Sequence, residues 1–128
     1  MGKQVLIADW TTIQGDSADS VLLPCPADAI VSVADAEHAV VNMEVAYATT
    51  HGAAHPILRL LGAPTLDGPW VEVESRNAAG TDTFLMSRDP GGTAQESLKG
   101  FLMWEVQEPG DATGTPYVIT FRISAVLS

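Results

Sequence analysis

The sequence from Tyr117 to Leu127 constrains the fold most strongly, because its side chains alternate between apolar and polar along most of its length. One face is formed by Tyr117, Ile119, Phe121, Ile123 and Leu127. The other face carries Thr120, Arg122 and Ser124. A period of two residues is that of a β-strand. Apolar residues on one face only indicate a sheet that lies between a core and water.

A second long strand is predicted just before it, at residues 101–107. The segment between the two strands contains Pro109-Gly110-Asp111 and Gly114, which are residue types typical of turns. We therefore predict that residues 101–107 and 117–127 form a hairpin of two long antiparallel strands.

Shorter strands, separated by Gly, Pro and Asp, are expected along the rest of the chain. They are predicted at residues 3–7, 20–23, 41–47, 57–61, 70–74 and 82–86, with residues 10–13 continuing or bending the first. Residues 27–38 are ambiguous: β-branched residues favour a strand followed by a turn, whereas residues 34–37 could form one helical turn. About eight short strands without a long helical period predict an all-β fold. The expected architecture is a single-domain, jelly-roll-like β-sandwich over residues 1–128, with residues 1–13 as an N-terminal arm or edge strand.

Charge and cysteine content exclude several classes of function. The formal net charge is −10, from 16 acidic residues against 6 basic ones. Because the basic residues are scattered, the chain lacks the positive patch that nucleic-acid binding needs. Its apolar runs are too short to span a membrane, and its N-terminus lacks the pattern of a secretory signal. Cys25 is the only cysteine, so no internal disulfide is possible, and stability must come from packing or from partner subunits.

No combination of side chains indicates catalysis. His51 and His55 have the spacing of two metal ligands on a helical turn, but Gly52 and Pro56 oppose a helix there. A zinc site also needs three or four converging ligands. The Asp residues of the turns match no calcium-binding loop and are common turn formers. We therefore expect ordinary loop histidines, no metal, no cofactor and no enzymatic activity.

Four apolar residues are candidates for partner binding: Val5, Ile7, Trp10 and Trp104. Trp104 has the opposite phase to Phe101 and Met103. It therefore either points outward, where it can bind a sugar or a neighbouring subunit, or belongs to a second core layer. Residues 3–7 either pair with an adjacent subunit by β-augmentation or fill an edge of their own sheet.

Three stretches resemble a sequence pattern that recurs in β-sandwich modules. Residues 58–73 run from a strand through an Asp-Gly turn into a strand that begins at Trp70. Residues 100–106 resemble a strand of the form Leu-aromatic-x-Trp-x-Val, and residues 117–123 resemble the last strand of these modules. Discoidin-like and carbohydrate-binding sandwiches contain this sequence pattern, and so do small accessory proteins of tailed-phage virions.

The resemblance implies a protein that binds and assembles. A chain with neither a leader nor a cysteine pair, and without an attached catalytic domain, is expected to be a virion component rather than a secreted adhesive module. The implied function is that of a bacteriophage structural protein, such as a capsid decoration or head-fibre protein. It would form homo-oligomers or bind other virion proteins, and be located in the virion after assembly in the host cytoplasm. The alternative is a carbohydrate-binding module that recognises a glycan through exposed aromatic side chains.

Overall fold

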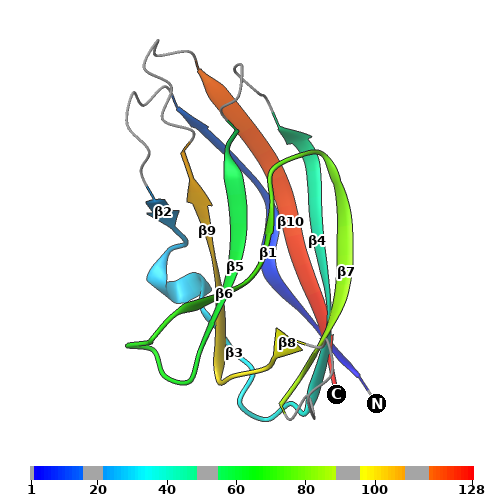
Figure 1. Ribbon diagram of the computed structural model, residues 1–128. Helices are drawn as coiled ribbons and strands as arrows, with labels where there is room; N and C mark the ends of the chain where they lie inside the picture. The colour runs from blue at the N-terminus through cyan, green and yellow to red at the C-terminus, as the bar shows by residue number, and fades with distance from the viewer. Residues whose placement is uncertain (1, 16–21, 49–54, 89–95, 109–115) are drawn as a thin grey trace.

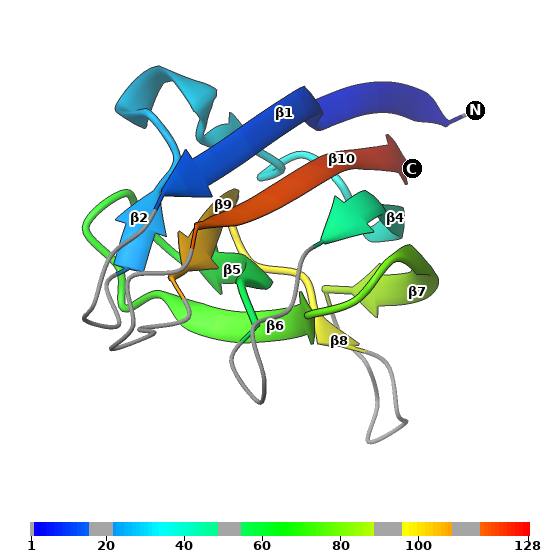
Figure 2. The same cartoon turned by 90° about the horizontal axis from the view of Figure 1, so that it is seen from above.

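The computed structural model describes residues 2–15, 22–48, 55–88, 96–108 and 116–128, which form two packed β-sheets (Figure 1). Sheet A contains, in spatial order, β1 (Lys3–Gly15), β10 (Tyr117–Leu127), β4 (His38–Ala48), β7 (Gly80–Ser87) and β8 (Glu96–Ser97). Sheet B contains β2 (Leu22–Pro24), β9 (Phe101–Gln107), β5 (Ile57–Ala63) and β6 (Val71–Arg76), and β3 (Val31–Ser32) also pairs with β9. Figure 2 shows the two layers end-on. The predicted all-β sandwich is therefore confirmed.

The described residues contain ten strands, two more than the approximate number predicted. The additional pairings are short: β8 has two residues and pairs in parallel with β7. Residues 27–38 contain the favoured strand followed by a turn in a short form: β3 is followed by a turn at residues 34–35, where the Ala36 N–H donates to the Val33 carbonyl at 3.1 Å. A 3₁₀ turn, η1 (Ala27–Ala29), precedes the two-residue strand β3. Pro24 and Pro26 lie directly before this region, and neither has a backbone N–H to donate to a neighbouring strand.

The predicted terminal hairpin is wrong, because β9 and β10 belong to different sheets. β10 pairs with β1 and β4, whereas β9 pairs with β2, β3 and β5. The connection at residues 108–116 is longer than the roughly two to five residues of a typical hairpin loop. The two strands instead face each other across the core, where the rings of Trp104 and Phe121 meet edge to face with centroids 5.0 Å apart. Their apolar faces thus cover each other.

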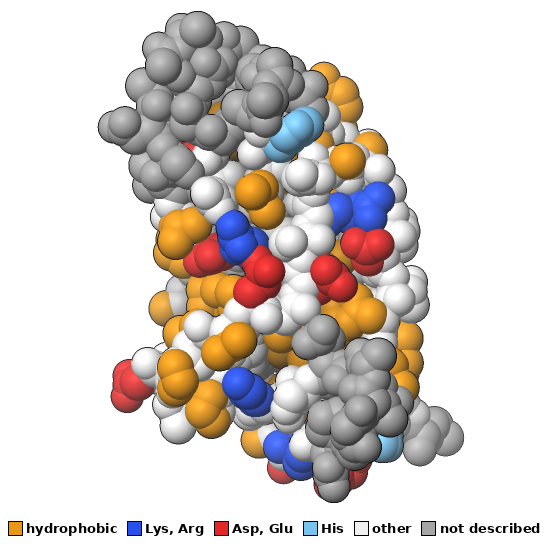
Figure 3. Space-filling model, viewed as in Figure 1, with side chains coloured by type: hydrophobic (Ala, Val, Ile, Leu, Met, Phe, Trp, Pro, Cys, Tyr) orange, Lys and Arg blue, Asp and Glu red, His pale blue; other side chains and the backbone are white. Residues whose placement is uncertain are grey.

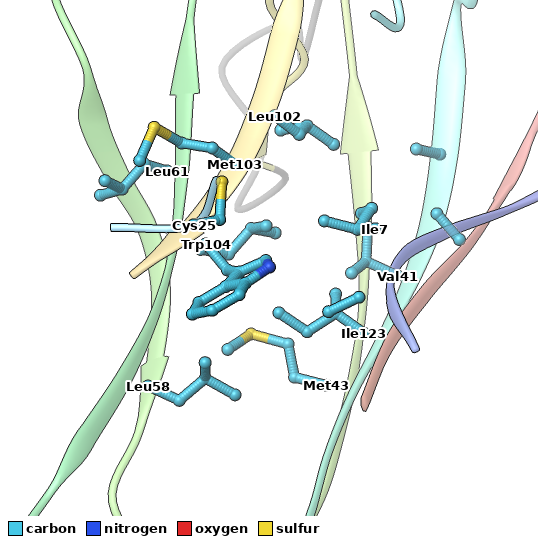
Figure 4. Close-up of a cluster of buried hydrophobic side chains, with 14 of the residues drawn as sticks. Ile7, Cys25, Val41, Met43, Leu58, Leu61, Leu102, Met103, Trp104 and Ile123 are labelled. Atoms are coloured by element: carbon cyan, nitrogen blue, oxygen red, sulfur yellow. The ribbon is translucent and has the colours of Figure 1, made fainter. Parts of the chain in front are cut away.

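The core is built by the alternation that the sequence shows. Tyr117, Ile119, Phe121, Ile123 and Leu127 are all buried, as predicted. Figure 4 shows side chains of both sheets meeting in this layer, among them Met43, Leu58, Leu102 and Ile123. Burying a side chain of this size contributes roughly 1.5–3 kcal/mol, so the strands are held mainly by this layer.

None of the described segments is a helix with the length and apolar character needed to cross a membrane.

Candidate functional site

The most distinctive surface of the molecule is the outer side of sheet A, which we call the outward face. Its side chains come from the four long strands β1, β10, β4 and β7, which lie next to one another. They are Gln4, Leu6, Trp10 and Thr12 of β1; Thr120, Arg122, Ser124 and Val126 of β10; Val40, Asn42, Glu44 and Tyr47 of β4; and Thr81, Thr83 and Leu85 of β7. Within this set only Glu44 and Arg122 are charged, although the chain has a net charge of −10.

One end of the outward face carries an apolar stripe, formed by Leu6, Val126, Val40 and Leu85. Val126 is paired with Val40, and Val40 with Leu85, so these three side chains lie side by side across the strands. Leu6 is next to them on β1, opposite Ser124. Each of the four side chains is between 39% and 52% exposed. The stripe therefore presents contiguous apolar area to solvent.

The stripe arises from four apolar triplets in the sequence. They are Val5-Leu6-Ile7, Ala39-Val40-Val41, Phe84-Leu85-Met86 and Ala125-Val126-Leu127. In a strand the outer residues of such a triplet face one side and the middle residue faces the other. The middle residue therefore points to solvent when its neighbours fill the core. Sequence reasoning missed these four residues, although an apolar residue on the outward phase was a visible signal.

The middle of the outward face holds a fixed aromatic ring. Arg122 donates hydrogen bonds from Nη2 to both carboxylate oxygens of Glu44, at 2.9 and 3.1 Å. The guanidinium carbon of Arg122 lies 4.9 Å from the ring centroid of Trp10, which is a cation–π distance. Trp10 remains 49% exposed. Glu44 thus positions Arg122, and Arg122 positions an indole that is open to solvent.

Tyr47 joins this face because of a β-bulge. Strict alternation along β4 predicts that Tyr47 shares the inward face of Val41, Met43 and Val45. The pairing shifts by one residue between Thr120 and Phe121, so that Tyr47 lies opposite Thr120 while Val45 lies opposite Phe121. The extra residue at position 46 reverses the phase. Tyr47 is consequently exposed, whereas unbroken alternation would have placed it inward.

Hydroxyl and amide groups complete the outward face. The hydroxyls of Thr12 and Thr120 are 2.9 Å apart and share a hydrogen bond. The Thr83 hydroxyl donates to the Asn42 side-chain oxygen at 2.5 Å. These cross-strand pairs add hydrogen-bonded but uncharged groups to the outward face.

The four predicted partner-binding residues do not come together. Trp10 lies on the outward face, but Ile7 and Trp104 are 3% and 6% exposed and belong to the core, with Val5 packed against it. Trp104 therefore does not point outward, and the second-layer alternative describes its position. Residues 3–6 pair with β10 of the same chain, so this strand fills an edge of its own sheet.

The predicted metal ligands are placed only in part. His51 lies outside the described residues, and His55 is partly buried. The residues that the structure describes contain no group of three or more His, Cys, Asp or Glu side chains that could hold a metal ion. Cys25 is a buried free thiol, and burial raises its pKa, so the reactive thiolate is disfavoured.

Other parts of the surface differ from the outward face in their charge. Arg59 of β5 forms an ion pair with Glu72 and a hydrogen bond to Gln107, and Arg76 pairs with Asp82 at 2.9 Å. In the view of Figure 3, acidic and basic side chains lie next to one another rather than in separate patches. By contrast, the side chains named for the outward face include a single ion pair, Arg122–Glu44.

Comparison with known proteins found no family. No protein-family model matches the chain, and no curated protein is significantly similar to it in sequence. One solved structure with some likeness is a chain of Bacillus endospore appendages, described as a family of disulfide-linked pili. It has 10% identity and a TM-score of 0.46, over 100% of this chain and 90% of that one. Another is the VP2 subviral particle of infectious bursal disease virus, with 13% identity and a TM-score of 0.36, over 99% of this chain and 40% of that one. These likenesses are too distant to bear on function.

Proposed function

We propose that the protein is a structural subunit that binds further copies of itself through the outward face. The apolar stripe of Leu6, Val126, Val40 and Leu85 is the observation that carries this proposal. The outer side of a half-solvated antiparallel sheet ordinarily presents polar side chains. A contiguous exposed apolar patch rimmed by polar residues is typical of a protein–protein interaction site.

Charge supports a second copy as the partner. Two molecules that each carry a charge of −10 repel each other, so a self-association surface must keep its own charge low. The outward face does so, because its one acid, Glu44, is paired with its one base, Arg122. A face of this kind can pack against an identical face without leaving an unpaired charge buried.

The area of the outward face is also consistent with binding of a second copy of the protein. β10 has 11 residues, and at about 3.3 Å per residue it is roughly 36 Å long. Four strands spaced about 4.8 Å apart are roughly 19 Å wide, which gives a face on the order of 700 Å². Each partner of a standard protein interface buries about 800 Å². The whole outward face, with Trp10 and Tyr47 as aromatic anchors, is therefore large enough for a specific interface.

More specifically, we propose that this structural subunit is a component of a tailed-phage virion, namely a capsid decoration or stabilising protein. The resemblance of residues 58–73 and 100–106 to accessory virion proteins supports this assignment. Of the four residues predicted from the sequence to bind a partner, we propose only Trp10 as part of this interface.

The oligomeric state tests the proposal. We expect light scattering coupled to gel filtration to show a mass that rises with protein concentration to that of a dimer or larger oligomer. Val126→Glu should shift this equilibrium to monomer, because it places a like charge in the stripe of both partners. Val71→Glu is the matched control: Val71 lies on β6 of sheet B and is 48% exposed, against 45% for Val126. A wild-type protein that stays monomeric throughout, or equal dissociation by both variants, would contradict the proposal.

Trp10 favours a second candidate function, the recognition of a glycan. Its exposed indole is fixed by Arg122 and Glu44, and a fixed ring can stack on a sugar without losing side-chain entropy. The charge of the chain and the pairing of Arg122 favour a neutral saccharide. A monomeric wild type that binds a glycan array, with binding lost in Trp10→Ala, would establish this alternative.

A further inference from the structure

The side chains of the outward face lie in rows that cross its four long strands. Cross-strand pairing places Val126 beside Val40 and, four residues further along both strands, Arg122 beside Glu44. At about 3.3 Å per residue, the ion pair lies roughly 13 Å from the apolar pair. β10 and β4 are the two central strands, so both pairs lie near the midline of the face. Together they can determine how a second copy docks.

The shape of the outward face favours aligned strands in the two copies. The face is roughly 36 Å long and 19 Å wide. Copies whose strands cross at right angles overlap over a square of roughly 19 Å on each side, about half of the face, whereas aligned copies bury all of it. A closed pair of identical copies is related by a two-fold axis. With aligned strands, that axis lies between the two faces and runs either along the strands or across them.

An axis along the strands, midway between β10 and β4, brings each row against the same row of the second copy. It places β10 of one copy over β4 of the other, so Val126 faces Val40 and stripe covers stripe. In the same way, Arg122 and Glu44 of one copy face Glu44 and Arg122 of the other. These two side chains are 36% and 25% exposed, so a second copy can reach them. Arg122 binds its own Glu44 through Nη2, and a guanidinium has further N–H donors for a second carboxylate.

An axis across the strands gives less favourable contacts. If it passes through the ion pair, Arg122 faces Arg122 and Glu44 faces Glu44. The stripe then covers Gln14 and Val118, which pair at the opposite end of β1 and β10. Like charges that face each other across an interface are strongly unfavourable. If the axis instead passes through the stripe, the copies overlap at that end only, and most of the face stays exposed.

We propose that two copies dock about a two-fold axis along β10 and β4, with stripe on stripe and with the two Arg122–Glu44 pairs forming a ring of alternating charge. This arrangement rests on the self-association proposed above and specifies its geometry. Charge pairs across an interface fix orientation more than they add affinity. Because the interface encloses the ring, salt screens it little.

A charge-exchange variant tests the orientation. The double variant Arg122→Glu with Glu44→Arg keeps an ion pair within each copy but exchanges the positions of its two charges. In the proposed arrangement, a mixed dimer with the wild type places Arg over Arg and Glu over Glu, so each protein should pair with its own kind. An axis across the strands would favour mixed dimers instead. The two chains have equal mass, so stable-isotope labelling of one of them distinguishes the dimers in native mass spectrometry.

Random exchange makes about half of all dimers mixed, and a tenfold weaker mixed association lowers that share to about a tenth. We expect a share well below half. The matched control exchanges the ion pair on the outer side of sheet B, as Arg59→Glu with Glu72→Arg, and should mix with the wild type at random. A share of half or more for the Arg122 and Glu44 exchange overturns the arrangement, although self-association of the wild type still supports the proposed function. A wild type that stays monomeric contradicts both.

A second measurement leaves the charges of the outward face unchanged. A nitroxide attached to Lys3→Cys lies at the stripe end of β1, and the native Cys25 is buried. Double electron–electron resonance then measures the distance between the labels of the two copies. The proposed axis places them about 20 Å apart, whereas an axis across the strands through the ion pair places them more than about 30 Å apart. The longer distance overturns the proposal.

Discussion

At the scale of single residues, Tyr117 makes the free energy of unfolding decrease as the pH rises through the alkaline range. Burial raises the pKa of its phenol, and the negative charge of Glu108 raises it further. The unfolded chain loses this proton near pH 10, whereas the folded protein retains it to higher pH. The contribution of Tyr117 to the free energy of unfolding is therefore fully present below about pH 10. It is lost as the pH rises through the pKa of Tyr117 in the folded protein.

We therefore predict that the free energy of unfolding falls above about pH 10, with this residue contributing about 1.4 kcal/mol per pH unit. Urea unfolding between about pH 8 and 11.5 measures the slope. Tyr117→Phe keeps the ring and removes the titration, so its slope should be smaller by that amount. The raised pKa of Cys25 acts in the same direction in both proteins and cancels in the comparison. Identical slopes would show that Tyr117 titrates alike in the folded and unfolded states.

Side-chain orientation could be predicted from the sequence where one face of a strand is clearly apolar, and not elsewhere. In β10, the buried positions of Phe121 and Ile123 follow directly from alternation. In β9, Met103 and Trp104 are both buried, so alternation alone cannot choose between them. Tyr47 shows a different limit, because a bulge depends on the partner strand and leaves no mark in its own sequence.

At the scale of elements, β1 is the strand whose removal is most informative. Residues 3–6 pair with β10, and the next two residues, Ile7 and Ala8, are buried in the core. Deleting residues 1–8 would expose the edge of β10 and remove two core side chains. We predict a lower melting temperature of the monomer, measured by circular dichroism.

The deletion of residues 1–2 alone is the control for that experiment, because Gly2 is exposed and precedes the strand. It should leave the melting temperature nearly unchanged. A folded monomer with the wild-type melting temperature after the longer deletion, together with loss of oligomers, would instead mean that the strand is exchanged between subunits.

Strand positions were predicted better than strand partners. The predicted bounds of β9 and β10 match the structure, but their pairing as a hairpin does not. Each strand has a strongly apolar face, and the sequence does not distinguish pairing at the edges from packing face to face. The arrangement is decided by the competing strands: β1 and β4 flank β10 on both edges and leave none for β9.

At the scale of the whole molecule, the outward face could not have been predicted as a unit. Its stripe requires the apolar triplets at residues 39–41, 84–86 and 125–127 to pair in register, and the triplet at residues 5–7 to lie on the neighbouring strand, displaced by two residues along it. That register follows from the order of strands in sheet A, which joins both ends of the chain to its middle. The chemistry of the face was therefore visible in the sequence, whereas its continuity was not.

The response of self-association to salt follows from the net charge and the outward face together. Copies of charge −10 repel over a Debye length of roughly 30 Å at 0.01 M ionic strength, but over only about 3 Å at 1 M. Apolar contact through the stripe is not weakened by that screening. We therefore predict that the association constant, measured by sedimentation equilibrium in sodium chloride, rises with salt concentration. Val126→Glu should remain mainly monomeric over the same range, because the charge that it buries in the interface is poorly screened. An association that weakens with salt would point instead to an interface built from ion pairs such as Arg59–Glu72, on the outer side of sheet B.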